Sequence, residues 1–487
     1  MSNRIVRTRF APSPTGHMHI GNLRSALYEY LVAKSQKGKF ILRIEDTDQE
    51  RVVEGAVEII YRTLKSCGLT YDEGPDIGGP HAPYIQSERR QHYLHHAERL
   101  VEEGKAYYCF CSKDKSVLNS VDDPADNFHS YDRSCRNLSA AEIAAHLSNG
   151  ESYVIRQKMP LTGTTKFVDE VFGEIAVENK ELEDQVLIKS DGFPTYNFAN
   201  VVDDHEMEIT HVVRGSEYLS STPKYNLLYE AFGWEIPNYI HLPLILGEDG
   251  SKLSKRHGAT SFGDLVKLGY LPEAIVNYIA FLGWAPGGDT REIFSLAELE
   301  NTFSVEGISK SPAIFSYAKL DWFNEQYLRV LSPDEFVEMI KPYTDDVFID
   351  KVYDPALLAR ILQTRTTKLS DIPDMIAFFR QADPLHIELY MQKRSKLNPE
   401  AGVEILTDLI AALTNLSDWT ENSIKDYLNA YAEDSGRKAG QVMGALRPSL
   451  SGRSVTPGGA IEMLIILGKE ESLKRLTAAL HFLQQTA

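Results

Sequence analysis

The sequence predicts an α/β protein: a doubly wound parallel sheet, interrupted by an α+β insertion and followed by an all-α C-terminal region. Three observations lead to this prediction. Two short apolar runs, residues 5–10 and 40–44, flank a helical pattern at 23–34, and together they make one βαβ unit. Residues 109–184 are polar and rich in Asp and Ser, with short strand-like pieces between. Beyond about residue 322 the patterns are mostly helical.

The later elements follow in chain order. A second helical pattern covers residues 57–67 and stops before Gly68, because glycine commonly terminates helices. Strand-like segments come next, at residues 153–157, 174–177, 186–189 and 209–214. The first two lie inside the polar stretch, and the last two mark the return to apolar, strand-forming sequence.

Bulk composition is that of an ordinary soluble globular protein, with 487 residues, 43% hydrophobic and 25% charged. The start has no signal-peptide pattern, and no apolar run approaches the ~20 residues that span a bilayer. We therefore expect a cytoplasmic protein with no membrane segment. Four cysteines in this length do not make a disulfide framework. The net charge of −18 excludes general nucleic-acid coating but not local basic patches.

The turn at residues 12–22 joins the first strand to the first helix and contains two prolines, two glycines and two histidines. Backbone N–H groups and the positive end of a helix dipole converge at such a position, which suits a polyphosphate. Far downstream, residues 252–256 (Lys-Leu-Ser-Lys-Arg) form a second polyphosphate candidate in a Gly-rich loop. We expect the two segments to grip the same nucleotide from opposite sides.

Polar side chains also follow several predicted strands. Arg9 ends the first strand, Glu45 follows the next, and Arg214 ends a later one. Ligands of open α/β sheets bind outside the carboxyl ends of the strands. These residues and the 12–22 turn are therefore predicted to meet in one site.

With these motifs in view, the chain resembles the class I aminoacyl-tRNA synthetases, and closely the bacterial glutamyl-tRNA synthetase family. Residues 9–16 resemble that family's opening, and residues 19–22 match its H-I-G-H signature with Asn22 in place of the last histidine. Residues 43–48 are similar to a strand-end motif of the glutamate and glutamine branch. Residues 191–205 resemble the second half of the site, and residues 252–256 match the K-M-S-K-S loop.

The resemblance implies ATP-dependent joining of L-glutamate to the 3′ end of tRNA(Glu) through a glutamyl-adenylate. ATP is a substrate, accompanied by Mg²⁺. The catalytic residues implied are His19, Lys252 and Lys255, which act by charge stabilisation and positioning. The ATP-binding residues implied are Thr15, Gly16, His19, Gly21, Asn22, Lys252, Ser254 and Lys255. The alternative for His19 is a turn histidine that only caps the helix. The alternative for residues 252–256 is a solvated basic loop.

Glutamate recognition requires cations facing its carboxylates, and the planar fork of arginine suits this task. The resemblance assigns Arg9 and Arg214 to the substrate carboxylates and Glu45 to its ammonium group. Ser13, Tyr196 and Asn200 are implied as further hydrogen-bond partners. The alternative is that Arg9 and Glu45 pair with each other as a salt bridge between neighbouring strand ends.

Three of the four cysteines lie in the insertion, and zinc takes four ligands, usually thiolate or imidazole. Some relatives carry zinc at a C-x-C…Y-x-x-x-C pattern, which this chain reproduces, so the resemblance implies one structural Zn²⁺. The ligands implied are Cys109, Cys111, Tyr131 and Cys135. Other relatives have histidine where Asn137 stands, so His92, His95, His96 or His129 is an alternative fourth ligand. Three reduced cysteines without metal are the remaining possibility.

Basic residues gather in the helical C-terminal region. No acidic residue occurs from 435 to 461, where Arg437, Lys438, Arg447 and Arg453 lie, and a second cluster contains Arg360, Arg365 and Lys368. By resemblance this region binds the anticodon, with Arg365 and Arg447 in contact and Arg365 reading the last base. Arginine there favours an enzyme that discriminates against tRNA(Gln). A solvated helix face is the alternative.

The resemblance divides the chain into five parts. They are a Rossmann-like catalytic domain in two halves (1–108 and 186–258), an acceptor-stem-binding insertion (109–185), a stem-contact domain (259–330) and a helical anticodon-binding domain (331–487). We expect a monomer. The rival functions are a glutaminyl enzyme, a truncated relative that modifies a tRNA base, a nucleotidylyltransferase of small metabolites, and an RNA-binding protein with a relic nucleotide site. The helical extension after residue 322 disfavours the first three, and intact motifs in both halves disfavour the last.

Overall fold

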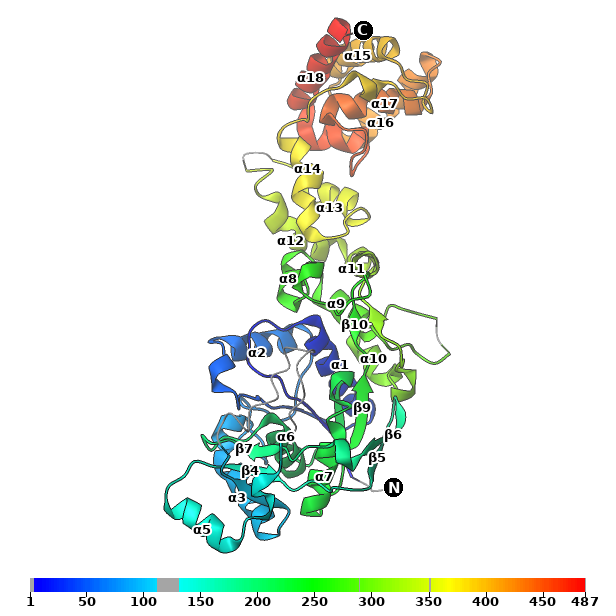
Figure 1. The fold of residues 1–487 in the computed structure, drawn as a ribbon. Helices are drawn as coiled ribbons and strands as arrows, with labels where there is room; N and C mark the ends of the chain where they lie inside the picture. The colour runs from blue at the N-terminus through cyan, green and yellow to red at the C-terminus, as the bar shows by residue number, and fades with distance from the viewer. Residues whose placement is uncertain (1–3, 112–130, 289, 350–351, 487) are drawn as a thin grey trace. The chain divides into compact units, whose positions relative to one another are not determined.

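The computed structural model describes residues 4–111, 131–288, 290–349 and 352–486 (Figure 1). It divides into two compact units. The first comprises Met1–Leu265 with Ile275–Tyr317, and the second comprises Val266–Ala274 with Ala318–Ala487. The predicted stem-contact segment, 259–330, is thus shared between the units. Among the described residues, no helix is long and apolar enough to cross a membrane.

The βαβ unit is present as predicted. Strands β1 (Arg7–Phe10) and β2 (Lys39–Leu42) pair in parallel, and helix α1 (Ile20–Ser35) connects them. The helix begins three residues before the expected position, because His19 acts as its N-cap and accepts a hydrogen bond from the Gly21 N–H. Gly21 and Asn22 therefore belong to the first helical turn. Helix α2 (Ala56–Ser66) ends just before Gly68, which has a φ of 72°.

A four-stranded sheet follows, with the strand order β6-β5-β9-β8. Strands β8 (His211–Gly215) and β9 (Asn238–Leu242) are parallel, and the Thr210 N–H donates to the Arg7 carbonyl at 3.0 Å. This bond joins the start of β8 to β1, so both strands deliver their carboxyl ends to the same edge. The hairpin of β5 (Thr164–Asp169) and β6 (Gly173–Glu178) extends this sheet, with β5 parallel to β9. The insertion thus shares hydrogen bonds with the catalytic sheet.

The remaining elements of the first unit surround these sheets. Strands β3 (Ala106–Cys109), β4 (Val154–Gln157) and β7 (Val186–Ile188) form a separate antiparallel sheet. The apolar run at 186–189, predicted as a strand of the second catalytic half, therefore pairs with β4 of the insertion. The other elements are α3 (Arg90–Glu102), α5 (Ala140–Ser148), α6 (Tyr196–Glu206), α7 (Thr222–Phe232), α8 (Phe262–Lys267), α9 (Pro272–Ala280), α10 (Leu296–Thr302), β10 (Ile245–Leu246) and β11 (Ala313–Ile314).

The second unit is helical in its described residues, as predicted. One hydrophobic core runs through it and includes Leu358, Phe378, Leu446 and Leu476, all fully buried. Side-chain caps begin several helices, among them a capping box between Ser332 and Glu335. Its helices are α11 (Tyr317–Val330), α12 (Pro333–Thr344), α13 (Pro355–Gln363), α14 (Ile372–Arg380), α15 (Pro399–Asn415), α16 (Glu421–Asp434), α17 (Ala439–Ser451) and α18 (Ala460–Thr486).

A buried ion pair secures the start of β1. Arg7 donates to both carboxylate oxygens of Glu73, at 2.8 and 3.0 Å, and the Tyr84 hydroxyl donates to Glu73 at 2.7 Å. Burial by itself raises the pKa of Glu73, but these hydrogen bonds and the charge of Arg7 outweigh it and lower the pKa to about 2. The unfolded value is about 4.3, so ionised Glu73 stabilises the folded state above that pH.

We expect Glu73→Gln to destabilise the first unit by about 2–3 kcal/mol at pH 7, which is a Tm decrease of roughly 5 °C. The difference from wild type should stay constant above pH ~5 and shrink as the pH falls from about 4.3 towards 2. Calorimetry across this range measures it. The control, Glu174→Gln, removes the exposed Lys166–Glu174 pair and should change little. Equal effects of the two variants, or a difference that grows in acid, would contradict the assignment.

Candidate active site

A cavity of about 430 Å³ lies between the N-terminal turn and the Lys-rich loop. We call it the turn–loop cavity. The structure brings the two predicted polyphosphate segments together on it. Backbone bonds join the turn to the residues that follow the loop: the Ile20 N–H donates to the Thr260 carbonyl at 2.9 Å, and the Phe262 N–H donates to the Met18 carbonyl at 3.2 Å. Its lining residues are His19, Gly21, Asn22, Arg24, Ser25, Gly215, Glu217, Pro243, Leu244, Ile245, Lys252, Leu253 and Ser254.

His19 presents a neutral donor to this cavity. Its Nδ1 accepts the backbone N–H of Gly21 at 3.1 Å, so the ring proton resides on Nε2. Burial and the neighbouring charge of Lys252 both lower the pKa of His19. The imidazole is therefore uncharged at neutral pH and offers one N–H at a helix N-terminus, where an anion is also favoured by the backbone.

The Lys252 loop is a structured hairpin. The Leu253 N–H donates to the Ile245 carbonyl at 3.0 Å, and the Gly247 N–H donates to the Ser251 carbonyl at 2.8 Å. His257 contacts Asp249 and receives the Ser254 N–H on its Nδ1. This framework holds Lys252 on the cavity. The Lys255 side chain lies outside the described residues, and Thr15 and Gly16, in the preceding turn, are not among the lining residues.

Arg214, at the end of β8, is buried but has no carboxylate partner among the described residues. Its Nε donates to the His241 Nε2 at 3.2 Å and its Nη2 to the Thr222 hydroxyl at 2.8 Å. His241 Nδ1 lies 2.7 Å from the buried Asp169 carboxylate, which holds the imidazole with its proton on Nδ1 and leaves Nε2 to accept from Arg214. Asp169, His241 and Thr222 were not predicted; Asp169 lies in the insertion, and no sequence signal joined it to Arg214.

Aromatic side chains surround the Arg214 guanidinium. The rings of Tyr218, Tyr225 and Tyr239 have their centres 4.6–5.4 Å from it. Tyr196 lies beside Tyr218, with ring centres 5.7 Å apart. Burial, together with the charge of Glu45, raises the pKa of Tyr196, so its hydroxyl remains a donor. The neighbouring Gly215 lines the turn–loop cavity. Arg214, which pairs with no acid in the described part of the chain, thus directly precedes a residue that lines that cavity.

Arg9 differs from Arg214 because it is already paired. It contacts Asp204 at 2.9 Å and Glu29 at 3.4 Å, while Glu45 pairs with Arg43 at 2.8 Å. The alternative salt bridge between Arg9 and Glu45 is therefore not formed, since Arg43 occupies that place. Burial opposes the charge of Arg9, but Asp204 and Glu29 together outweigh it and raise the pKa. Of the other predicted glutamate contacts, Ser13 is exposed and Asn200 is buried.

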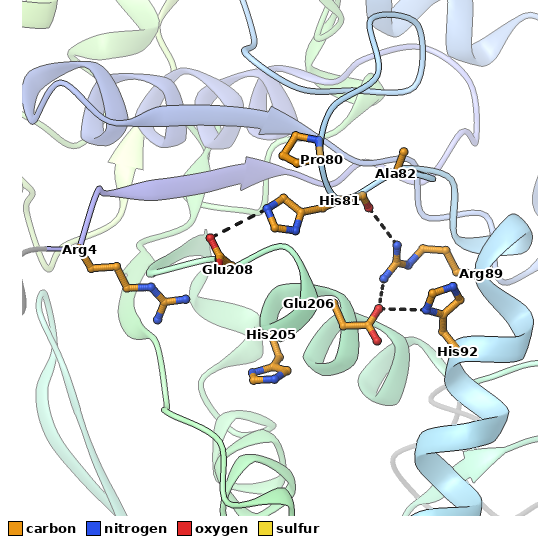
Figure 2. Close-up of a pocket in the computed structure, with 9 residues that line it drawn as sticks. All are labelled: Arg4, Pro80, His81, Ala82, Arg89, His92, His205, Glu206 and Glu208. Atoms are coloured by element: carbon orange, nitrogen blue, oxygen red, sulfur yellow. Dashed lines mark hydrogen bonds and ion pairs between the residues drawn. The ribbon is translucent and has the colours of Figure 1, made fainter.

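This ionic network continues away from the site to a second cavity of about 500 Å³ (Figure 2). Arg43 approaches Asp203, Asp203 accepts from Arg89, and Arg89 contacts Glu206. Glu206 also lies 3.2 Å from His92 and 2.9 Å from His96. Two of the histidines considered as zinc ligands are therefore engaged here. This second cavity is lined by Arg4, Pro80, His81, Ala82, Arg89, His92, His205, Glu206 and Glu208.

The three cysteines that the resemblance implied as ligands lie together. The sulfur atoms of Cys109, Cys111 and Cys135 lie within 4.8 Å of one another, and the Tyr131 hydroxyl is 3.2 Å from the Cys109 Sγ. Burial raises the pKa of the Cys109 thiol, but Tyr131, the Cys111 backbone and the Arg156 guanidinium together lower it. Cys109 therefore favours the thiolate, the form that binds metals, whereas burial raises the pKa of the Cys135 thiol to about 11. His129 lies outside the described residues.

The C-terminal basic residues have different surroundings. Arg365 is exposed just after α13, and Arg447 is half-buried in α17. Arg437 pairs with Glu404, and Arg453 pairs with Asp383 at 2.6 Å. The acid-free run in the sequence is thus partly neutralised in space by acids from other helices. Arg360 likewise binds Glu421 at 2.8 Å.

Comparison with known proteins covers the whole chain. A sequence family described as "tRNA synthetases class I (E and Q), catalytic domain" matches residues 5–322, and one described as "Anticodon binding domain" matches residues 335–480. A glutamate–tRNA ligase of Clostridium novyi is 53% identical, over 100% of this chain and 99% of that protein. The one of Clostridium acetobutylicum is 52% identical over 100% of both.

Solved structures agree with these sequences. A glutamate tRNA ligase of Elizabethkingia meningosepticum, crystallised with its amino acid, superposes with a TM-score of 0.88 at 38% identity, over 99% of this chain and 100% of that one. A glutamate-tRNA synthetase of Elizabethkingia anophelis gives 0.87 at 37% identity, over 98% and 100%.

Proposed function

Since this chain belongs to the glutamate–tRNA ligase family of class I tRNA synthetases, we propose that it joins L-glutamate to the 3′ end of tRNA(Glu) at the expense of ATP. The observation that carries the proposal is the turn–loop cavity, where a helix N-terminus, His19 and Lys252 face one space beside Arg214. A polyphosphate and a dicarboxylate, both anions, thereby have adjacent binding positions of positive charge.

The reaction proceeds in two transfers. A carboxylate oxygen of glutamate attacks the α-phosphorus of ATP, the bond to the β-phosphate oxygen breaks, and pyrophosphate leaves with glutamyl-adenylate formed. A ribose hydroxyl of the tRNA then attacks the glutamyl carbonyl, and AMP leaves. His19 donates its Nε2 proton as a hydrogen bond, and Lys252 neutralises charge that grows on the leaving pyrophosphate. ATP enters as its Mg²⁺ complex.

The remaining predicted site residues complete this proposal. Lys255 assists Lys252, and the pyrophosphate side of the nucleotide is bound by Thr15, Gly16, Gly21, Asn22 and Ser254. Arg214 holds a substrate carboxylate, because none of the described acids occupies it. Arg9 contributes from within its Asp204 pair, and Glu45, Ser13, Tyr196 and Asn200 contact the rest of glutamate. The insertion, 109–185, and residues 259–330 contact the tRNA stem.

Pyrophosphate exchange tests this function. With labelled pyrophosphate, ATP and purified tRNA, we expect exchange that depends on glutamate and is absent with glutamine. Exchange driven equally by glutamine, or by no amino acid at all, would contradict the proposal. The assay run without tRNA shows whether activation requires the bound RNA.

Anticodon reading is proposed for Arg365 and Arg447 in the second unit. Arg365 is exposed and joins no ion pair in the described part of the chain, and the Arg447 Nε is buried without a hydrogen-bond partner there. Arginines with free N–H groups suit splayed-out bases. Arg365 favours charging of tRNA(Glu) alone. We further propose a cytoplasmic monomer.

The cysteine cluster is proposed as a structural Zn²⁺ site. Three thiolates with a phenol offer four ligands of suitable chemistry, and the nearby Arg156 offsets their excess negative charge. Zinc held there would cross-link β3 to the turn around Tyr131 and Cys135 and stabilise the insertion. No step of the reaction depends on it.

Metal analysis of the purified protein should find about one zinc per chain. Cys111→Ser should lose most of this zinc, because serine is a poor zinc ligand. Cys67→Ser, at the one cysteine outside the cluster, should retain it. Equal zinc content in all three proteins, or none in the wild type after growth with zinc, would refute the site.

A further inference from the structure

The pairing of buried arginines in this chain follows a pattern. Eight arginines are at most 7% exposed. Five of them contact carboxylates within ion-pair distance. The other three, Arg24, Arg156 and Arg214, have no such partner among the residues that the structure describes. Burying a cation without an acid is costly, so each of the three requires an explanation.

Two of the three lie where an anion is expected. Arg214 faces the proposed seat of a glutamate carboxylate, and Arg156 lies against the thiolate cluster. Arg24 remains. It projects from α1, one turn after Gly21, and lines the turn–loop cavity while only 4% exposed.

The surroundings of Arg24 leave its charge uncompensated. Its Nη1 donates to the Leu282 carbonyl at 3.1 Å and its Nη2 to the Pro243 carbonyl, both uncharged acceptors. Its Nε–H is buried and makes no hydrogen bond in the described structure. Burial lowers the pKa of Arg24, in contrast to the raised values of Arg9 and Arg43. Tyr28 and Glu217 act on this pKa in the opposite, raising direction, but Glu217, which also lines the cavity, is exposed and forms no ion pair with Arg24 in the described structure.

We propose that Arg24 is a nucleotide-binding residue whose buried positive charge selects the phosphorylated, anionic form of the ligand in the turn–loop cavity. A polyanion that binds in the cavity supplies a negative charge opposite the Arg24 guanidinium. Because the guanidinium is buried in a region of low dielectric, the attraction between the two charges is strong. This role rests on the proposed function, because ATP is the anion concerned. It goes beyond the N-terminal motif, which stops at Asn22.

A structural role for Arg24 makes a different prediction. If the guanidinium serves only to hold the Leu282 and Pro243 carbonyls, its loss should weaken binding of any adenine ligand alike. Tyr28 offers a matched control, because its hydroxyl donates to the Ala280 and Leu282 carbonyls at 3.0 and 3.2 Å but does not line the cavity. Tyr28→Phe removes support from the same carbonyl without altering charge.

The test compares dissociation constants for MgATP and for adenosine, measured by calorimetry on the full chain with tRNA present. Arg24→Gln should weaken ATP binding about tenfold or more and leave adenosine within about twofold, as expected for one lost charge-assisted interaction. Arg24→Lys should restore most of the ATP affinity, and Tyr28→Phe should keep both constants. Because dissociation constants report only folded protein, partial misfolding does not imitate this result.

The inference would be overturned if Arg24→Gln weakened the binding of ATP and of adenosine equally. It would also be overturned if Arg24→Lys failed to restore ATP binding. Wild-type protein that binds neither ligand would instead overturn the proposed function. The two failures are therefore distinguishable.

Discussion

Lys252→Ala is expected to lower the kcat of glutamate-dependent pyrophosphate exchange by about a hundredfold or more, the usual cost of removing one charge that stabilises a transition state. Lys252 and His19 both line the turn–loop cavity, and the charge of Lys252 lowers the pKa of His19. The leaving pyrophosphate gains negative charge as the bond breaks. The effect should therefore appear mainly in kcat and less in the KM for ATP.

Arg256→Ala is the matched control for Lys252. Arg256 carries the same charge on the same loop, but its guanidinium binds Ser251 and it does not line the cavity. We expect its kcat to stay within about threefold of wild type, as for a solvated surface charge. If both substitutions reduced kcat equally, the summed positive charge of the loop would explain the data, and the specific role of Lys252 would be contradicted.

Arg214→Gln should raise the KM for glutamate by about a hundredfold and leave the KM for ATP nearly unchanged, since a lost hydrogen-bonded charge pair is worth ~2–3 kcal/mol. Arg214 is buried, holds no acid among the described residues, and is oriented by His241 and Thr222. The proposal assigns it a carboxylate of the substrate glutamate. Steady-state exchange at varied glutamate and varied ATP measures both constants.

Arg7→Gln controls for damage to the sheet. Arg7 is also buried at a strand of the same region, but its partner is Glu73. Its loss should lower Tm while the KM for glutamate remains within about twofold. A rise in the KM for ATP equal to that for glutamate in Arg214→Gln would remove Arg214 from the glutamate role. Arg9→Ala should also raise the KM for glutamate more than that for ATP.

Local signals made the first βαβ unit and the helical C-terminal region predictable. Turn residues between a strand and a helix, and the periodicity of apolar residues, are signals that extend over about ten residues. The structure confirms both the βαβ unit and the helical region that they predicted. The junction between residues 18–20 and 260–262 is long-range in sequence. The prediction covered only the meeting of the 12–22 turn with the 252–256 loop, which rested on the two polyphosphate motifs and the family resemblance; it did not include these bonds.

The partners of the buried charges could not be predicted in the same way. Arg9 had several acids within reach, and whether it meets Glu45 or Asp204 depends on how α6 packs under β1. The same applies to Asp169, because β5 had to join the catalytic sheet before its carboxylate could reach His241. Which acid pairs with which buried arginine is decided by how the elements pack, and patterns in a single sequence do not report that packing.

The central claim is that the N-terminal turn and the Lys252 loop bind one nucleotide between them. A crystal structure with glutamate and a non-hydrolysable ATP analogue tests it most directly. We predict phosphate oxygens in contact with both the His19 Nε2 and the Lys252 Nζ, with the base against Pro243 and Leu244. A nucleotide found instead in the cavity around His81 and Glu206, touching neither residue, would contradict the account.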